Sequence, residues 1–185
     1  MKKFLTISPF IIILFSSTLF VGCFGVDGNF SSLKNKILSS TGNRYYTDVE
    51  FSVGSFGISI AKAVVKSDDN DREAKEILDN ISHVQIGVYK NHHSSSFNNS
   101  FQILKDIDSQ MMENGWQYVV RSRCNKEVTG VYVKIVNGNE LKELFVVNLD
   151  QRELTLVEVK GNLEKVLETA IREKGFKLGH SFAFN

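Results

Sequence analysis

The sequence predicts a single α+β domain in which a mainly antiparallel sheet carries helices packed on one face. Three observations predict it: apolar and polar residues alternate in short runs, tight turns join the last of these runs, and helical apolar stripes lie between and after them. With 185 residues, 42% hydrophobic and 23% charged, the chain can form one domain with a hydrophobic core. We expect this domain over residues 45–185.

The first half of the domain mixes strands with helices. Val49, Phe51 and Val53 alternate with polar residues, as in a strand with one buried face. Gly54 and Gly57 open a small-residue stretch over 58–65 that suits a tightly packed helix. The pattern then predicts a helix with Ala74, Ile77 and Leu78 on one side, a strand through Val84, Ile86 and Val88, and a helix bearing Phe101, Leu104, Ile107 and Met111.

The second half contains four consecutive strand-like runs and a final helix. The runs cover residues 116–123, 128–136, 141–148 and 154–159. Short links such as Asn137-Gly138-Asn139 and Asp150-Gln151-Arg152 pair neighbouring strands antiparallel. The final helix carries an apolar stripe that we expect to be buried, formed by Leu163, Val166, Leu167, Ala170 and Ile171.

The first 23 residues have the layout of a bacterial lipoprotein leader. Lys2-Lys3 precede an apolar run from Phe10 to Phe20, which is shorter than the roughly 20 residues of a membrane-spanning helix. Leu19-Phe-Val-Gly-Cys23 resembles the lipobox, although Phe20 stands where leucine is usual. We predict a signal peptide over 1–22 and acylation of Cys23, palmitate included, which would attach the protein to a lipid bilayer. An uncleaved membrane anchor is the alternative.

The residues after Cys23 predict how the domain is attached. We interpret residues 23–44 as the lipidated cysteine and a flexible tether, because their start is rich in Gly, Ser and Asn. Leu33, Ile37 and Leu38 nevertheless have helical spacing. Phe24 stands where, in a rule that this sorting resembles, aspartate retains a lipoprotein on the inner membrane. We therefore expect the periplasmic side of the outer membrane in a host with two membranes.

Charge and motif content argue against several classes of protein. Without its leader, whose only charges are Lys2 and Lys3, the chain has 20 basic and 21 acidic residues, so it has no overall attraction to nucleic acid. Cys124, which we expect at the end of a buried strand face, and His92-His93 lack the partners of a metal site. The sequence has no Gly-rich phosphate loop, G-x-S-x-G or H-E-x-x-H motif. We predict no catalytic residue, cofactor or metal.

Six polar or aromatic residues predict a recognition surface. They occupy strand positions opposite the apolar ones, which would gather them on an uncovered sheet face: Gln85, Tyr89, Arg121, Arg123, Tyr132 and Lys134. Tyrosine and arginine are enriched at interface hot spots. Two arginines could also hold a carboxylate or phosphate, or pair with Glu127 or Glu143 on neighbouring strands. The remaining alternative is that other parts of the protein cover this face.

From about Val49 to Gly161 the chain resembles a bacterial family catalogued as domain of unknown function 4252. The resemblance is carried by Val84–Tyr89, by Gly115-Trp116 with Val119-Val120-Arg121, and by Leu144–Val147 leading into 154–161. It implies a small exported protein, often a lipoprotein, and no established activity. We expect a membrane-anchored module of the cell envelope that binds a protein partner. A structural envelope protein without a ligand is the second reading, and an enzyme is the third.

Overall fold

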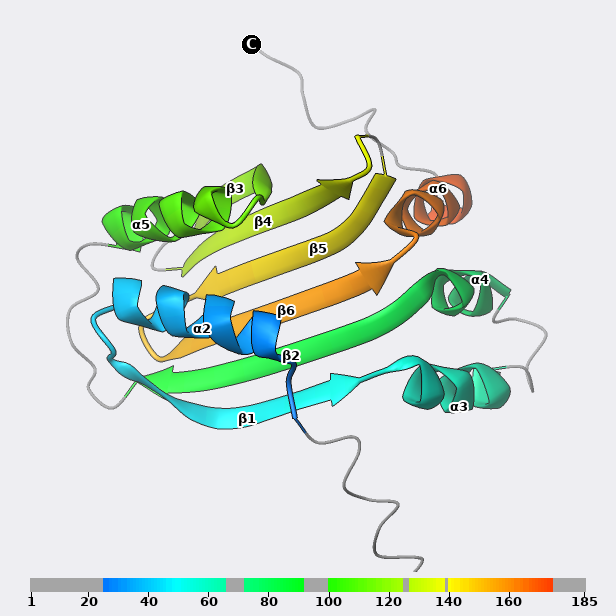
Figure 1. Cartoon of the computed structure of the whole chain (residues 1–185), viewed down its shortest axis with the longest axis horizontal. Coiled ribbons are helices and arrows are strands. Elements are labelled where there is room, and N and C mark those ends of the chain that lie inside the picture. Colours follow the sequence, from blue (N-terminus) through cyan, green and yellow to red (C-terminus); the bar gives the residue numbers. More distant parts are fainter. Residues whose placement is uncertain (1–24, 66–71, 92–99, 125–126, 139, 175–185) are drawn as a thin grey trace, which may run out of the picture.

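The computed structural model describes residues 25–65, 72–91, 100–124, 127–138 and 140–174. These residues form one α+β domain, which confirms the predicted fold class. A six-stranded sheet carries two helices across one of its faces, and three further helices gather at one end of the sheet (Figure 1). The predicted signal peptide, Cys23 and the His92-His93 pair lie outside the described residues.

The helices and strands follow the periodicity of the sequence, with one addition, α2. In chain order they are α2 (Gly28–Ser40), β1 (Tyr45–Val53), α3 (Ser55–Val65), α4 (Arg72–Asn80), β2 (Ile81–Asn91), α5 (Ser100–Glu113), β3 (Gln117–Cys124), β4 (Glu127–Val136), β5 (Glu140–Leu149), β6 (Glu153–Gly161) and α6 (Leu163–Lys174).

The strands lie in the order β1-β2-β6-β5-β4-β3, and every neighbouring pair is antiparallel. The run from β3 to β6 is a meander, as the short links predict. Between β4 and β5, Asn137 and Gly138 have φ angles of 53° and 87°, which the tightest hairpin turns require. The meander ends with β6 beside β2, so the last strand lies inside the sheet.

The main hydrophobic core lies between the sheet and two helices, α2 and α5 (Figure 1). The Phe145 ring on β5 is at its centre, with its centroid 5.7 Å from that of Phe30 on α2 and 5.5 Å from that of Trp116. Other fully buried core side chains are Ile37, Tyr89, Ile107, Met111, Val128, Tyr132, Val147, Leu149, Leu154 and Leu156. We call this side of the sheet the covered face.

Helix α2 corrects the prediction of a flexible tether over residues 23–44. The Asp27 side chain accepts a hydrogen bond from the Phe30 N–H at 2.8 Å and so caps the start of the helix. Phe30, Leu33 and Ile37 are then 0%, 6% and 0% exposed, because their spacing turns all three toward the sheet. Gly, Ser and Asn fill the exposed side, and this composition hid the stripe.

The opposite side of the sheet carries two continuous apolar rows across the strands. One row is Phe51, Ile86, Val157, Val146, Val131 and Val120, and the adjacent row is Val53, Val84, Val159, Leu144 and Val133. We call these side chains the aliphatic face. The described part of the chain buries none of them fully: Val120 is 48% exposed and the others are half-buried.

Helix α6 contacts α4 at one end of the sheet, where the Asn162 N–H donates to the Asn80 carbonyl at 2.7 Å. Leu163 and Thr169 are buried, but Leu167 and Ile171 are 52% and 47% exposed. The expectation of a fully buried apolar stripe was therefore wrong. A helix at the end of a sheet has fewer neighbours than one lying across it, so part of its apolar stripe stays outside. No helix in the described ranges has the length and apolar character needed to cross a membrane.

Candidate functional site

The six residues predicted to form a recognition surface do share one face of the sheet, but it is the covered face. Gln85, Tyr89 and Tyr132 are 0% exposed beneath the helices. The prediction of an uncovered polar-aromatic face is therefore wrong. The half-exposed side is the aliphatic face.

Each buried tyrosine lies along its own strand and reaches an acidic partner. The Tyr89 hydroxyl donates to Glu50 Oε1 at 2.8 Å, and the Tyr132 hydroxyl donates to Asp108 Oδ1 at 2.7 Å. Burial and the neighbouring carboxylate raise the pKa of both phenols. These tyrosines therefore stabilise the covered face and present no hydroxyl to a partner.

Arg121 also serves the packing of α5 on the sheet. Its Nη2 lies 2.7 Å from Asp108 Oδ2, and its guanidinium carbon lies 3.9 Å from the Tyr118 ring centroid. A bulge between Tyr118 and Val120 interrupts the alternation of β3, which is why Tyr118 and Arg121 share a face. The acid that pairs with Arg121 is thus Asp108 on α5, and not Glu127 or Glu143 on a neighbouring strand.

The remaining β3 residues lie at an exposed sheet edge. Arg123 is exposed beside Val128 of β4. Cys124 is exposed as well, which corrects the expectation that it ends a buried face. Both belong to the strand with the least cover in the described chain.

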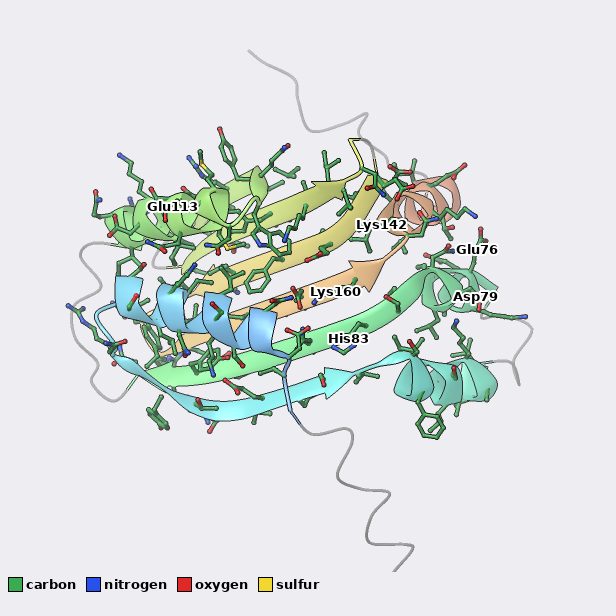
Figure 2. All side chains as sticks on the ribbon, in the orientation of Figure 1. Glu76, Asp79, His83, Glu113, Lys142 and Lys160 are labelled. Carbon is green, nitrogen blue, oxygen red and sulfur yellow. The ribbon has the colours of Figure 1, made fainter. Side chains whose placement is uncertain are left out.

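The structure places Lys134 at a polar hollow on the covered face. A row of polar residues that pair across neighbouring strands runs through this region (Figure 2 labels two of them). In order across the sheet, they are His83, Lys160, Glu143 and Lys134. The Lys134 ammonium lies 5.5 Å from the Trp116 ring centroid. The hollow has a volume of about 150 Å³ and is lined by Asn29, Ser32, Leu33, Asn114, Trp116, Lys134, Glu143 and Glu158.

A polar network borders the hollow, with Gln85 and Glu158 buried and Asp27 and Lys160 partly buried. Gln85 donates through Nε2 to Glu158 Oε2 at 2.5 Å and accepts through Oε1 from the Asp27 N–H at 2.6 Å. Lys160 Nζ lies 2.9 Å from Asp27 Oδ2 and 3.2 Å from Glu158 Oε2. This network joins the residues just before α2 to β2 and β6, and it orders the start of the domain.

The electrostatics of the network differ between its two acids. Burial raises the pKa of Glu158 by more than Lys160 and Gln85 lower it. Burial also acts to raise the pKa of Asp27, but the hydrogen bond from the Phe30 N–H and the charge of Lys160 outweigh it. The pKa of Asp27 is therefore lowered. For Lys160, burial lowers the pKa while the two acids raise it more. The three charged groups therefore satisfy one another, which is the arrangement of a structural network.

Sequence reasoning missed Asp27 because it lies in the segment interpreted as a tether, and it missed Glu158 and Lys160 because charged side chains near a strand end are usually exposed to solvent. One signal was available: Asp27 precedes a helical stripe, as an N-cap does. Chemically, the hollow offers two carboxylates, an ammonium and an indole to a small polar group. Its volume is below the roughly 300 Å³ at which small-molecule sites begin. Across the described residues, no three His, Cys, Asp or Glu side chains gather as metal ligands.

These features define an α+β domain with a purely antiparallel sheet, a polar network beside the start of α2 and a half-exposed aliphatic face. The chain belongs to the family described as Domain of unknown function (DUF4252), whose model matches residues 45–166 and confirms the resemblance seen in the sequence. Searches of curated proteins and of solved structures return no match. The family match begins after α2, although α2 contributes to the same core.

Proposed function

We propose that this protein is a membrane-anchored lipoprotein of the cell envelope whose domain binds a partner protein through the aliphatic face. Acylated Cys23 is the anchor in this proposal. The outer membrane is its location in a host with two membranes, because Phe24 follows the cysteine. Binding, rather than catalysis, is the activity proposed for the domain.

The aliphatic face is the observation that carries the binding role. One of its rows crosses all six strands and the other crosses five, and six strands span about 24 Å at the usual strand spacing. Neither row contains a charged residue, and contiguous exposed apolar patches mark protein contacts. A broad sheet face suits a partner with its own flat apolar surface, such as a second sheet or an amphipathic helix.

The anchor is tested by replacing the cysteine that would carry it. Cys23→Ser is expected to abolish incorporation of a labelled fatty acid and to leave the precursor unprocessed in cells. Cys124→Ser, which removes the other cysteine, is the matched control and should leave acylation intact. An acylated and processed Cys23→Ser protein would refute the anchor.

The binding face is tested by two substitutions on the same edge strand. Val120 belongs to the aliphatic face, and Ser122 is an exposed residue two positions along the same side of β3. We expect Val120→Lys to abolish recovery of the partner by crosslinking in cells, and to abolish its binding when the partner is purified and titrated. Ser122→Lys should bind normally.

Val146→Lys, at the centre of the face, extends this test to the middle of the sheet. Thermal unfolding of each variant must accompany the binding data, because a lysine that unfolds the domain would also abolish binding. Equal binding by the wild type and both folded aliphatic-face variants would refute this surface.

A further inference from the structure

The fold begins almost immediately after the predicted lipid anchor. The Gly25 carbonyl accepts a hydrogen bond from the Ser52 hydroxyl at 2.7 Å, Val26 packs against the core, and Asp27 is held by Lys160. Only Phe24 separates Gly25 from Cys23. Two residues of extended chain span at most about 7 Å, so an acylated Cys23 would hold the surface around Ser52 against the bilayer.

Helix α3 begins close to this attachment point. Ser55, its first residue, follows Ser52 by three positions, which is at most about 10 Å of extended chain. Helix α3 follows the end of β1, and the first turn of α2 is the end of that helix nearer to α3 (Figure 1). The surface that the short link would press toward the lipid therefore includes α3.

The exposed side of α3 is apolar. Phe56, Ile60 and Val64 are 75%, 53% and 70% exposed, and their i, i+4, i+8 spacing places them in one stripe along the helix. The helix has a single charged residue, Lys62, which pairs with Asp79 of α4 at 3.2 Å (Figure 2 labels Asp79). The other exposed residues of the helix are Ser55, Ser59 and Ala63, so no charge interrupts the stripe.

We propose that α3 lies in the headgroup region of the bilayer, with Phe56, Ile60 and Val64 inserted toward the acyl chains beside the lipidated cysteine. This inference rests on the proposed anchor. An interfacial helix normally needs basic residues to hold it at a membrane. Here the acyl chains supply the attachment, and an uncharged stripe is sufficient. With 11 residues, α3 is about 16 Å long, which suits lying along the surface.

The consequence is a fixed orientation of the domain. A lipoprotein on a long tether samples all orientations, whereas a short link together with an inserted helix presents the same surfaces away from the membrane. The six exposed positions of α3 would then be unavailable to soluble partners.

The test uses the acylated full chain in vesicles of phosphatidylethanolamine and phosphatidylglycerol. In a Cys124→Ser background, Ile60→Cys is labelled with a small environment-sensitive fluorophore. Ser109→Cys, an exposed position on α5, is the matched control. Lipids brominated along their acyl chains are expected to quench the probe at position 60 several-fold more strongly than the probe at position 109.

The outcomes separate the anchor from the orientation. Equal, weak quenching at both positions in protein that still co-floats with the vesicles would overturn the insertion of α3 and leave the anchor standing. Protein that does not co-float, and whose mass lacks the lipid, would overturn both. Crosslinking between two copies through position 60, without quenching, would assign the stripe to self-association and overturn the insertion.

Discussion

The hydroxyl of Tyr132 lies over Gly130 of the same strand, so closely that a Cβ on this glycine would stand 2.6 Å from the hydroxyl oxygen. Strand β2 repeats the relationship, because a Cβ on Gly87 would clash with the Tyr89 hydroxyl. In both strands the glycine makes room for a ring that lies along the strand. The sequence pattern Gly-x-Tyr thus marks where a large polar side chain fits beneath a helix.

Gly130→Ala is expected to destabilise the domain by about 1–3 kcal/mol, because the added methyl would displace a fully buried ring. Urea unfolding measures this free energy. Gly28→Ala is the control: a Cβ at Gly28 meets nothing within 4 Å, and alanine is the better helix former. Equal unfolding midpoints for Gly130→Ala and the wild type would contradict the close packing of Tyr132.

A combined change of Tyr132→Ala and Arg121→Ala distinguishes packing from recognition on the covered face. Asp108 is 4% exposed and would lose both its hydrogen-bond donor and its cation. Together with the cavity left by the ring, we expect a loss of more than about 3 kcal/mol in the free energy of unfolding. Unchanged thermal stability with lost partner binding would instead return these residues to a recognition surface.

The periodicity of the sequence was sufficient for the strands and for most helices. Alternation identifies two faces of a strand, but it does not say which face a helix will cover. Here Tyr89 and Tyr132 lie beneath helices because each finds an acid for its hydroxyl, while valines and isoleucines fill the other side. Such pairings come from distant parts of the chain, and the local pattern does not contain them.

A local bulge and a polar network between distant residues also escaped prediction. The bulge in β3 shifts the alternation by one residue, so Tyr118 joins the face of Arg121. The polar network was missed because it joins residues that are far apart in the sequence, Asp27 to Lys160 and Gln85 to Glu158. The family resemblance gave the fold and no site.

Glu158→Gln is expected to make stability at neutral pH higher than in the wild type. Burial raises the pKa of Glu158 above its ordinary value of 4.5, so the folded protein binds this proton more readily than the unfolded chain. The stabilisation from protonation is fully present below pH 4.5 and is lost as the pH rises through the raised pKa. Glutamine resembles the protonated form at every pH.

The measurement is the difference in unfolding free energy between Glu158→Gln and the wild type from pH 7 down to pH 4. This difference should be largest near pH 7 and shrink as Glu158 takes up its proton. Asp27, with its lowered pKa, acts in the opposite sense, since its contribution is lost on acidification below 3.8, but it is common to both proteins. Exposed Glu113→Gln controls for the loss of one negative charge. A constant difference across the range would contradict the raised pKa.

Phe30→Ala tests whether α2 belongs to the domain, and it is expected to cost about 3–5 kcal/mol. The side chain is 0% exposed, and its ring contacts the Phe145 ring at the centre of the core. Asn35→Ala, at an exposed position of the same helix, should change stability by less than about 0.5 kcal/mol.

Truncation gives a second test of α2. A chain that starts at residue 45, where the family match starts, should be less stable than one that starts at Gly25, because it lacks the three buried side chains of α2. Equal unfolding curves for Phe30→Ala, Asn35→Ala and the wild type would mean that α2 is the tether its composition suggests, and the short link between anchor and fold would then be lost as well.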